Sequence, residues 1–373
     1  MISPRKFISS NLRIQETQSF SFPQDNSLAE IYHQKIRKRL CSGVILLFLL
    51  ILFSYLSIKL GSVEVSWKGL IQALFKKSDL AFIIWNIRLP RTAGAVLAGA
   101  ILGMAGAVMQ NLLKNPLASP FTLGVSHGAG FGAALAIIVF GAGQTHSYGS
   151  EAVTILSAFP VAGLAFLGSM TSVSFILLIS YFKRATAESI ILAGVALSSL
   201  FSSATMLLQY FASDVRVAAT VFWLFGDLGK AGWKENQMIL AGFVLAFIYF
   251  FWQRWNFNAL NWGDEVARSL GVNLERTRLL GMFFSATVVA LVTAFFGIIG
   301  FVGLISPHMT RLIIGNDFRF VLPYSALTGA CLLLVVDLVA RRLLAPVILP
   351  TGIVTSFIGV PVFVFLLLKR KRI

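Results

Sequence analysis

Residues 88–132 read RLPRTAGAVLAGAILGMAGAVMQNLLKNPLASPFTLGVSHGAGFG, and this stretch decides the fold. An apolar run from 92 to 113 is followed by a short polar segment and by a second apolar run from 120. Each run approaches the ~20 residues that a helix needs to cross a hydrocarbon core. Asn115-Pro116 lies between them, and proline ends a helix because it lacks an amide donor and restricts the residue before it. The stretch therefore predicts two consecutive membrane helices joined by a tight turn.

The composition of the whole chain points to the lipid bilayer as its solvent. Of the 373 residues, 57% are hydrophobic and 12% are charged, and the mean hydropathy is +0.82. Soluble domains average about 45–50% apolar and about 25% charged residues. Because helices satisfy their own backbone hydrogen bonds in lipid, we expect an all-α, polytopic membrane protein.

Apolar length and polar breaks predict about ten membrane helices. The predicted spans lie near 42–60, 92–113, 120–141, 156–181, 189–211, 237–253, 279–297, 298–314, 321–340 and 351–368. The run 279–314 can also be drawn as one long span. Residues 1–40 are polar and are predicted to form a mobile N-terminal tail, which leaves 41–373 as the membrane domain.

Basic residues at the two ends of the chain predict its orientation. Lys and Arg collect on the cytoplasmic side of membrane proteins. We therefore expect both termini in the cytoplasm, and we read the net charge of +16 as a sign of topology rather than of nucleic-acid binding. The residues concerned are Lys35, Arg37, Lys38 and Arg39 before the first span, and Lys369, Arg370, Lys371 and Arg372 after the last.

The pattern of polar residues does not favour an enzyme. The four histidines lack metal-ligand spacing, and Asp264-Glu265 is the sole adjacent pair of carboxylates. A phosphate-binding loop is excluded because Gly229-Lys230 is followed by Ala231 and lacks the upstream glycine. We expect no catalytic residue, metal or cofactor on this chain, so any ATP would be bound by another subunit.

Glycines at four-residue intervals predict close helix packing. Gly99 and Gly103 lie in the second span, and Gly124, Gly128 and Gly132 lie in the third. Small residues let helix backbones approach in lipid, where no hydrophobic drive brings helices together. The alternative is that glycine is simply frequent in membrane helices.

Arginines at the predicted outer ends of two spans admit two interpretations. Arg88 and Arg91 begin the second span, and Arg341-Arg342 ends the ninth. Their guanidinium groups could pair with carboxylates of a docking partner, or they could anchor the helices at the interface. Asp337 lies four residues before Arg341 and could neutralise it on one helix face. On the opposite side, the polar loop 254–278 is predicted to form two short helices joined at Gly271.

Several motifs together resemble the permeases of the FecCD family of ABC transporters, which import iron-siderophores, heme and cobalamin. The resemblance covers the chain from about residue 60 to 373. It is carried by Arg88–Thr92, Met109-Gln110, Asn115–Ala118, Pro120, Leu123–Ser126, Gly128-Ala129, Leu192–Leu197, Gly263–Ala267, Ser269–Asn273, Gly300–Leu304, Pro307-His308, Arg311, Leu349–Gly352 and Gly359–Pro361.

This resemblance implies a type II importer permease of about ten helices in a bacterial inner membrane. The implied partners are two cytoplasmic ATPases that bind ATP and Mg²⁺, an external substrate-binding protein, and a second permease copy or a paralogue. Iron(III)-siderophore is the expected cargo, with heme or cobalamin as alternatives. An ion-driven secondary transporter is the alternative from another class, but it would need ionisable residues at a midplane cavity, and the predicted span interiors hold few.

The resemblance also implies roles for particular residues. By position, Arg88, Arg91 and Arg341 match arginines that receive glutamates of the binding protein. Asn115 and Leu117 match the cytoplasmic gate of a cobalamin permease of this family, and Thr186 is the one hydroxyl in the opposing loop 184–188, where Glu188 departs from the family pattern. The loop 263–278 matches the helices that couple to the ATPases, with Asp264, Glu265, Ala267, Ser269, Leu270, Gly271 and Val272 as coupling residues.

Overall fold

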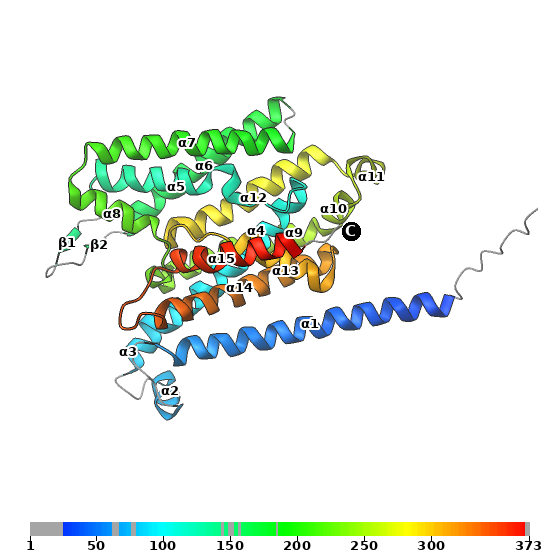
Figure 1. The fold of residues 1–373 in the computed structure, drawn as a ribbon, viewed down its shortest axis with the longest axis horizontal. Helices are drawn as coiled ribbons and strands as arrows, with labels where there is room; N and C mark the ends of the chain where they lie inside the picture. The colour runs from blue at the N-terminus through cyan, green and yellow to red at the C-terminus, as the bar shows by residue number, and fades with distance from the viewer. Residues whose placement is uncertain are drawn as a thin grey trace, which may run out of the picture.

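The computed structural model describes residues 25–61, 67–75, 80–142, 145–147, 153–155, 158–183 and 186–369. Within these residues, seven helices are long and apolar enough to cross a membrane, and three shorter apolar helices accompany them. Each of the ten predicted spans contains one of these helices, so the polytopic helical fold is confirmed (Figure 1).

The apolar helices, both membrane-length and shorter, follow one another along the chain with smaller elements between them. These apolar helices are α1 (Asp25–Lys59), α4 (Leu89–Leu112), α5 (Val125–Ala134), α6 (Ala158–Lys183), α7 (Ala187–Tyr210), α9 (Trp233–Trp252), α12 (Leu274–Phe296), α13 (Val302–Ile314), α14 (Phe318–Arg342) and α15 (Thr351–Lys369). The smaller helices are α2 (Trp67–Leu74), α3 (Ala81–Ile83), α8 (Asp214–Leu224), α10 (Arg254–Asn261) and α11 (Asp264–Ser269). The turns are η1 (Ile84–Arg88), η2 (Pro120–Leu123), η3 (Leu135–Val139) and η4 (Leu228–Lys230), and strands β1 (Thr145–Ser147) and β2 (Val153–Ile155) pair antiparallel.

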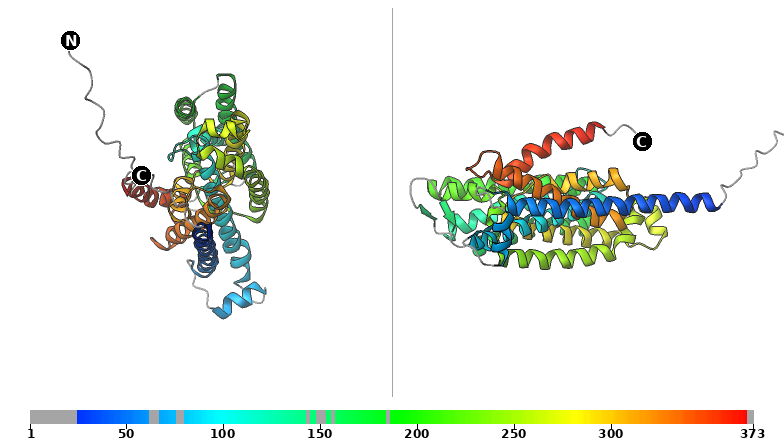
Figure 2. Two further views of the ribbon diagram at one scale, coloured as in Figure 1. Left: turned by 90° about the vertical axis from the view of Figure 1, so that its right-hand side faces the viewer. Right: turned by 90° about the horizontal axis from the view of Figure 1, so that it is seen from below.

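Helix α4 forms the centre of the bundle. The apolar window of its span is 83% buried, whereas that of α1 is 6% buried. Helix α4 packs against α9, α12, α13 and α14, while α1 runs along the outside and extends beyond the bundle (Figures 1 and 2). The difference follows from side-chain size, because α4 is rich in Gly and Ala, which admit close neighbours, and α1 is rich in Leu, Ile and Phe.

Glycines make the closest helix contacts in this bundle. A Cβ atom on Gly99 of α4 would lie 2.7 Å from the carbonyl carbon of Gly329 on α14, and Gly103 faces Ser325 one turn away. A Cβ atom on Gly128 of α5 would lie 2.9 Å from the carbonyl carbon of Gly168 on α6, and Gly132 faces Leu164 in the same contact. No side chain fits between these backbones without moving them.

Gly124 faces Ser172 of α6, one turn from Gly168, so it belongs to the same contact between segments as Gly128 and Gly132. It has a φ of +75° and lies at the turn between η2 and α5. Left-handed backbone is costly for residues that carry a Cβ atom, so glycine is needed there for its conformation. Gly124 therefore combines a close contact with α6 and a left-handed backbone.

The bundle has two ends, which we name after Arg91 and Asp264. The Arg91 end holds α2, α3, α8 and the start of α4 (Figure 1). The Asp264 end holds α10, α11 and the end of α4. The predicted loops 61–91 and 212–236 thus contain short helices, of which α8 packs against α5 and η3.

The N-terminal helix begins earlier than the sequence indicated. Helix α1 starts at Asp25, so residues 25–40 are helical rather than a mobile tail, and residues 1–24 lie outside the described part of the chain. Residues 25–40 contain neither Gly nor Pro, so nothing in them breaks the helix. Arg39 holds this segment to the bundle, since its Nε donates to the carbonyl of Ile314 at 3.1 Å and its Nη1 lies 3.3 Å from Asp317.

The predicted pair of short helices in the loop 254–278 is arranged differently. Gly271, with a φ of +80°, joins α11 to the first turn of the long helix α12, so the second predicted short helix is part of a span. The other short helix is α10, and Gly263, with a φ of +112°, separates it from α11.

Candidate functional site

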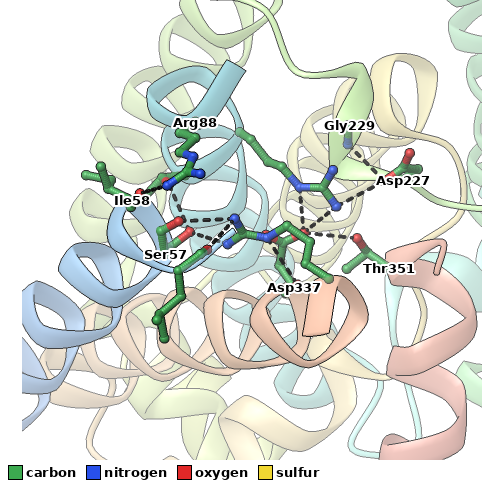
Figure 3. A network of polar contacts seen from close by, with 11 residues as sticks. Ser57, Ile58, Arg88, Asp227, Gly229, Asp337 and Thr351 are labelled. Atoms are coloured by element: carbon green, nitrogen blue, oxygen red, sulfur yellow. Dashed lines mark hydrogen bonds and ion pairs between the residues drawn. The ribbon is translucent and has the colours of Figure 1, made fainter. Parts of the chain in front are cut away.

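Asp337 of α14 is the centre of a buried polar network at the Arg91 end (Figure 3). Its side chain has no exposed surface. Arg91 donates to Oδ1 from Nε at 2.9 Å and from Nη2 at 2.8 Å, and Nε of Arg341 lies 3.0 Å from Oδ2. Thr351 of α15 donates to Oδ1 at 3.4 Å. One buried carboxylate therefore pairs with two guanidinium groups and joins three helices.

The same arginines close the end of α1. Arg341 donates from Nη1 to the carbonyls of Ser57 and Leu60, both at 3.1 Å, and from Nη2 to the Ser57 hydroxyl at 2.8 Å. Arg88 donates from Nη1 to the carbonyls of Ile58 and Lys59 at 2.8 and 3.0 Å. The last carbonyls of a helix have no partner within the helix and carry partial negative charge. Two arginines therefore cap α1 at its C-terminus.

Asp227 is the solvent-accessible member of the network. Its side chain is 33% exposed, and its Oδ1 lies 3.4 Å from Nη2 of Arg91. The same oxygen accepts a hydrogen bond from the Gly229 amide at 2.9 Å, which caps η4. The Arg91 side chain thus reaches from the dry carboxylate of Asp337 to a carboxylate at the surface.

The predicted docking residues Arg88, Arg91 and Arg341 lie together at the Arg91 end and are largely buried. Their exposed fractions are 5%, 7% and 6%, and their guanidinium groups are occupied by Asp337, Asp227 and the carbonyls of α1. A charged group in a largely dry position must find such partners because an unpaired one is costly. Arg342, next to Arg341, is exposed.

Asp264 is the centre of a second ion-pair cluster at the opposite end. Nζ of Lys114 lies 2.6 Å from Oδ1, and Nη2 of Arg278 lies 2.9 Å from each carboxylate oxygen. Burial raises the pKa of Asp264, but the hydrogen bonds and charges of Lys114 and Arg278 outweigh this effect and hold the pKa below its ordinary value. Asp264 is therefore ionised at neutral pH and joins α11 to both α4 and α12.

The other predicted coupling residues surround Asp264. Glu265, Ser269, Leu270 and Gly271 are exposed, Val272 is half-buried, and Ala267 is buried. Sequence reasoning missed two exposed apolar neighbours, Trp262 and Val266, which are 79% and 43% exposed. Leu270 is 66% exposed, and together the three side chains form an apolar surface on α11 and the residues that flank it, at a polar end of the molecule.

The predicted gate residues lie on two separate turns at this end. The Asn115 side chain accepts a hydrogen bond from the Leu117 amide at 2.8 Å, and Leu117 is 46% exposed. Thr186 caps α7 by accepting from the Ser189 amide at 3.3 Å, while residues 184 and 185 of its loop lie outside the described residues. A cavity of about 360 Å³ lies between the end of α4 and the start of α7.

A groove rich in hydroxyl groups runs between α7 and the start of α5. It has a volume of about 510 Å³ and is lined by Phe121, Thr122, His127, Ile191, Gly194, Val195, Ser198, Ser199, Ser202 and Ser203. Sequence reasoning missed this surface, although the paired serines in an apolar helix were a visible signal.

The fold and its two polar ends define a polytopic membrane protein whose helices are held by charge clusters at both ends. Residues 49–369 match the FecCD transport family, and the chain belongs to that family. It is therefore an ABC transporter permease of the FecCD type.

Three relatives illustrate the match. A predicted ABC transporter permease protein of Methanocaldococcus jannaschii is 49% identical over 343 residues, which cover 91% of this chain and 98% of the relative. The hemin transport system permease of Yersinia pestis is 35% identical with the same coverage. The vitamin B12 import system permease of Shigella boydii is 36% identical over 339 residues, covering 91% of this chain and 97% of the relative.

A solved structure has the same fold. It is an inward-facing conformation of a predicted metal-chelate type ABC transporter, with a TM-score of 0.75 and 32% sequence identity. The alignment covers 87% of this chain and 97% of that one.

Proposed function

We propose that this chain is the membrane-spanning subunit of an ATP-driven importer of a metal chelate. The observation that carries the proposal is the similarity, over 91% of the chain, to permeases named for hemin and vitamin B12 import. These relatives do not support the narrower prediction of an iron(III)-siderophore. The proposed cargo is therefore a metal chelate, the class that includes heme, cobalamin and iron-siderophores.

The Asp264 end faces the cytoplasm in this proposal, and the Arg91 end faces outward. Exposed basic residues of α1, among them Lys35, Arg37 and Lys38, adjoin Arg39, which contacts Ile314 and Asp317 at the Asp264 end. Their position supports this orientation because basic residues favour the cytoplasmic side. Each terminus is then cytoplasmic.

The apolar surface formed by Trp262, Val266 and Leu270 is the proposed docking site for an ATPase subunit. These side chains lie at an aqueous end of the molecule, where exposed apolar groups favour a partner. The predicted coupling residues from Asp264 to Val272 belong to the same segment. Two such ATPases, each with ATP and Mg²⁺, would serve a pair of permeases.

The Arg91 end is the proposed docking surface for a substrate-binding protein. Arg88, Arg91 and Arg341 serve this surface by holding α1, α4 and α14 in place. Asp227 and the exposed Arg342 are two charged groups at the surface that a partner could meet.

The hydroxyl groove on α7 supports a second permease copy. Ser198, Ser199, Ser202 and Ser203 line this groove, and Ser199 and Ser203 are exposed. A polar groove is unfavourable against lipid. A second copy placed against α7 would enclose the groove, and cargo would pass along it between the copies.

Reconstitution in proteoliposomes tests the proposal. The chain is purified with the ATPase and binding protein encoded beside it, and uptake of an iron(III)-siderophore, hemin and cobalamin is measured with and without ATP. We expect ATP-dependent uptake of one of the three. Uptake by the chain alone under a proton gradient, without any ATPase, would instead establish an ion-driven secondary transporter.

A further inference from the structure

The last turn of α4 and the turn that follows it contact the loop after α9 at two points. At the first, Nζ of Lys114 contacts Asp264 of α11 at 2.6 Å. At the second, the Asn111 side chain donates to the carbonyl of Phe257 at 3.2 Å and to Oδ1 of Asn261 at 2.6 Å, both on α10. Both short helices of the loop therefore hold the end of α4.

Lys114 is well placed to transmit a displacement. It has a φ of +47°, a left-handed conformation that is unfavourable for a residue with a Cβ atom. The next residue is Asn115, whose side chain holds the Leu117 amide. A displacement of the Lys114 side chain therefore acts on the strained turn 113–119, which contains Leu117.

The surroundings leave room for such a movement. The cavity of about 360 Å³ is lined by Leu112 and Leu113 at the end of α4, by Ala187 and Ile190 of α7, and by Arg278. Arg278, near the start of α12, contacts both oxygens of Asp264, so the ion-pair cluster lies beside a cavity into which the turn can shift.

We infer that the Lys114–Asp264–Arg278 cluster links the ATPase-docking helix α11 to the turn 113–119, with Lys114 and Asp264 as positioning residues for the cytoplasmic gate. The inference rests on the proposed function. A displacement of α11 caused by an ATPase moves Asp264, the ion pair carries Lys114 with it, and Leu117 changes its position at the exit.

The test compares ATP hydrolysis and cargo uptake in the same proteoliposomes. Asp264→Asn and Lys114→Met remove the ion pair, whereas Asp264→Glu retains its charges. We expect the two neutral variants to lose at least about tenfold in uptake per ATP hydrolysed, a typical size for coupling between sites. Asp264→Glu recovers most of this loss.

Asp317→Asn is the matched control. Asp317 is a carboxylate at the same end that pairs with Arg39 and Arg319, on α1 and α14 rather than on α4. Its replacement leaves uptake per ATP unchanged. The inference is overturned if Asp264→Asn keeps normal uptake per ATP, or if hydrolysis and uptake fall by the same factor. Absence of ATP-dependent uptake in the wild type overturns the proposed function itself.

A cross-link provides a second measurement. Lys114→Cys and Asp264→Cys are combined in a chain whose native Cys41 and Cys331 are replaced by Ala, and the pair is joined by a flexible bifunctional thiol reagent that contains a disulfide bond. We expect the cross-link to restore uptake per ATP and its reductive cleavage to abolish it again. A cross-linked protein that hydrolyses ATP without uptake would overturn the inference, because the link would then have to break during transport.

Discussion

Arg91 of α4 and Asp337 of α14 form an ion pair at 2.8 Å, although 246 positions separate them in the chain. Asp337 is completely buried and also lies 3.0 Å from Arg341. The single negative charge of Asp337 therefore partly neutralises both Arg91 and Arg341. The Arg91–Asp337 pair also stabilises the close contact between α4 and α14 that Gly99 and Gly103 allow.

Replacement of Asp337 by Asn should destabilise the protein strongly. The amide keeps the shape of the side chain but leaves Arg91 and Arg341 without their shared counter-charge, a change that typically costs about 3–5 kcal/mol for a buried pair. Thermal unfolding in detergent measures the loss. Asp214→Asn, at an exposed carboxylate of α8, is the control, and an equal loss in both variants would contradict the role of Asp337.

Substitution of Gly99 by Ala should also lower stability. The added methyl would meet the backbone of Gly329 and Ala330, and overpacking of this kind costs about 1–3 kcal/mol. Gly163→Ala, on α6, is the matched control because a Cβ atom there meets nothing within 4 Å. Denaturation of both variants in the same detergent compares them, and equal stability would show that α4 and α14 can move apart freely.

Leu270→Asp should weaken association with the ATPase. The side chain is 66% exposed, so a carboxylate there leaves the fold intact but places a charge on the apolar surface. We expect at least about tenfold weaker binding, as for a central interface residue. Binding of the purified permease to its ATPase measures the effect. Leu344→Asp, a 57% exposed leucine at the Arg91 end, should bind normally, and a matching loss there would argue against the assigned surface.

Lys230 should make stability depend on pH above neutrality. Burial lowers its pKa to about 8 from 10.5, although the charge of Asp227 opposes the shift. Between these two values the unfolded chain binds more protons than the folded one, so the stability of the folded protein rises with pH.

Thermal unfolding at pH 7, 8 and 9 tests this expectation. The wild type should gain stability relative to Lys230→Met as the pH rises through this range. Lys234→Met replaces an exposed lysine four residues away and should run parallel to the wild type. If the stability of all three proteins changed with pH in parallel, Lys230 would be charged throughout the range from pH 7 to pH 9.

Local features of the chain predicted most of the fold. The apolar helices follow from the length of apolar runs, and the turn after α4 follows from Asn115-Pro116, because both depend on neighbouring residues alone. The start of α1 was misjudged, since polar residues such as Lys35 and Arg37 indicate a tail although they are good helix formers. Tertiary contact through Arg39 holds that segment to α13 and α14.

The roles of charged residues depended on the tertiary structure. The Asp337–Arg341 pair was visible at a spacing of four, but the pairing of Arg91 with Asp337 and of Lys114 with Asp264 joins helices far apart in the chain. By itself, the sequence determined a helical membrane protein, its spans and its family resemblance, because these rest on local apolar length and motif spacing. Only the tertiary structure decided which arginines are buried, because the partner of a charge depends on which helices pack together.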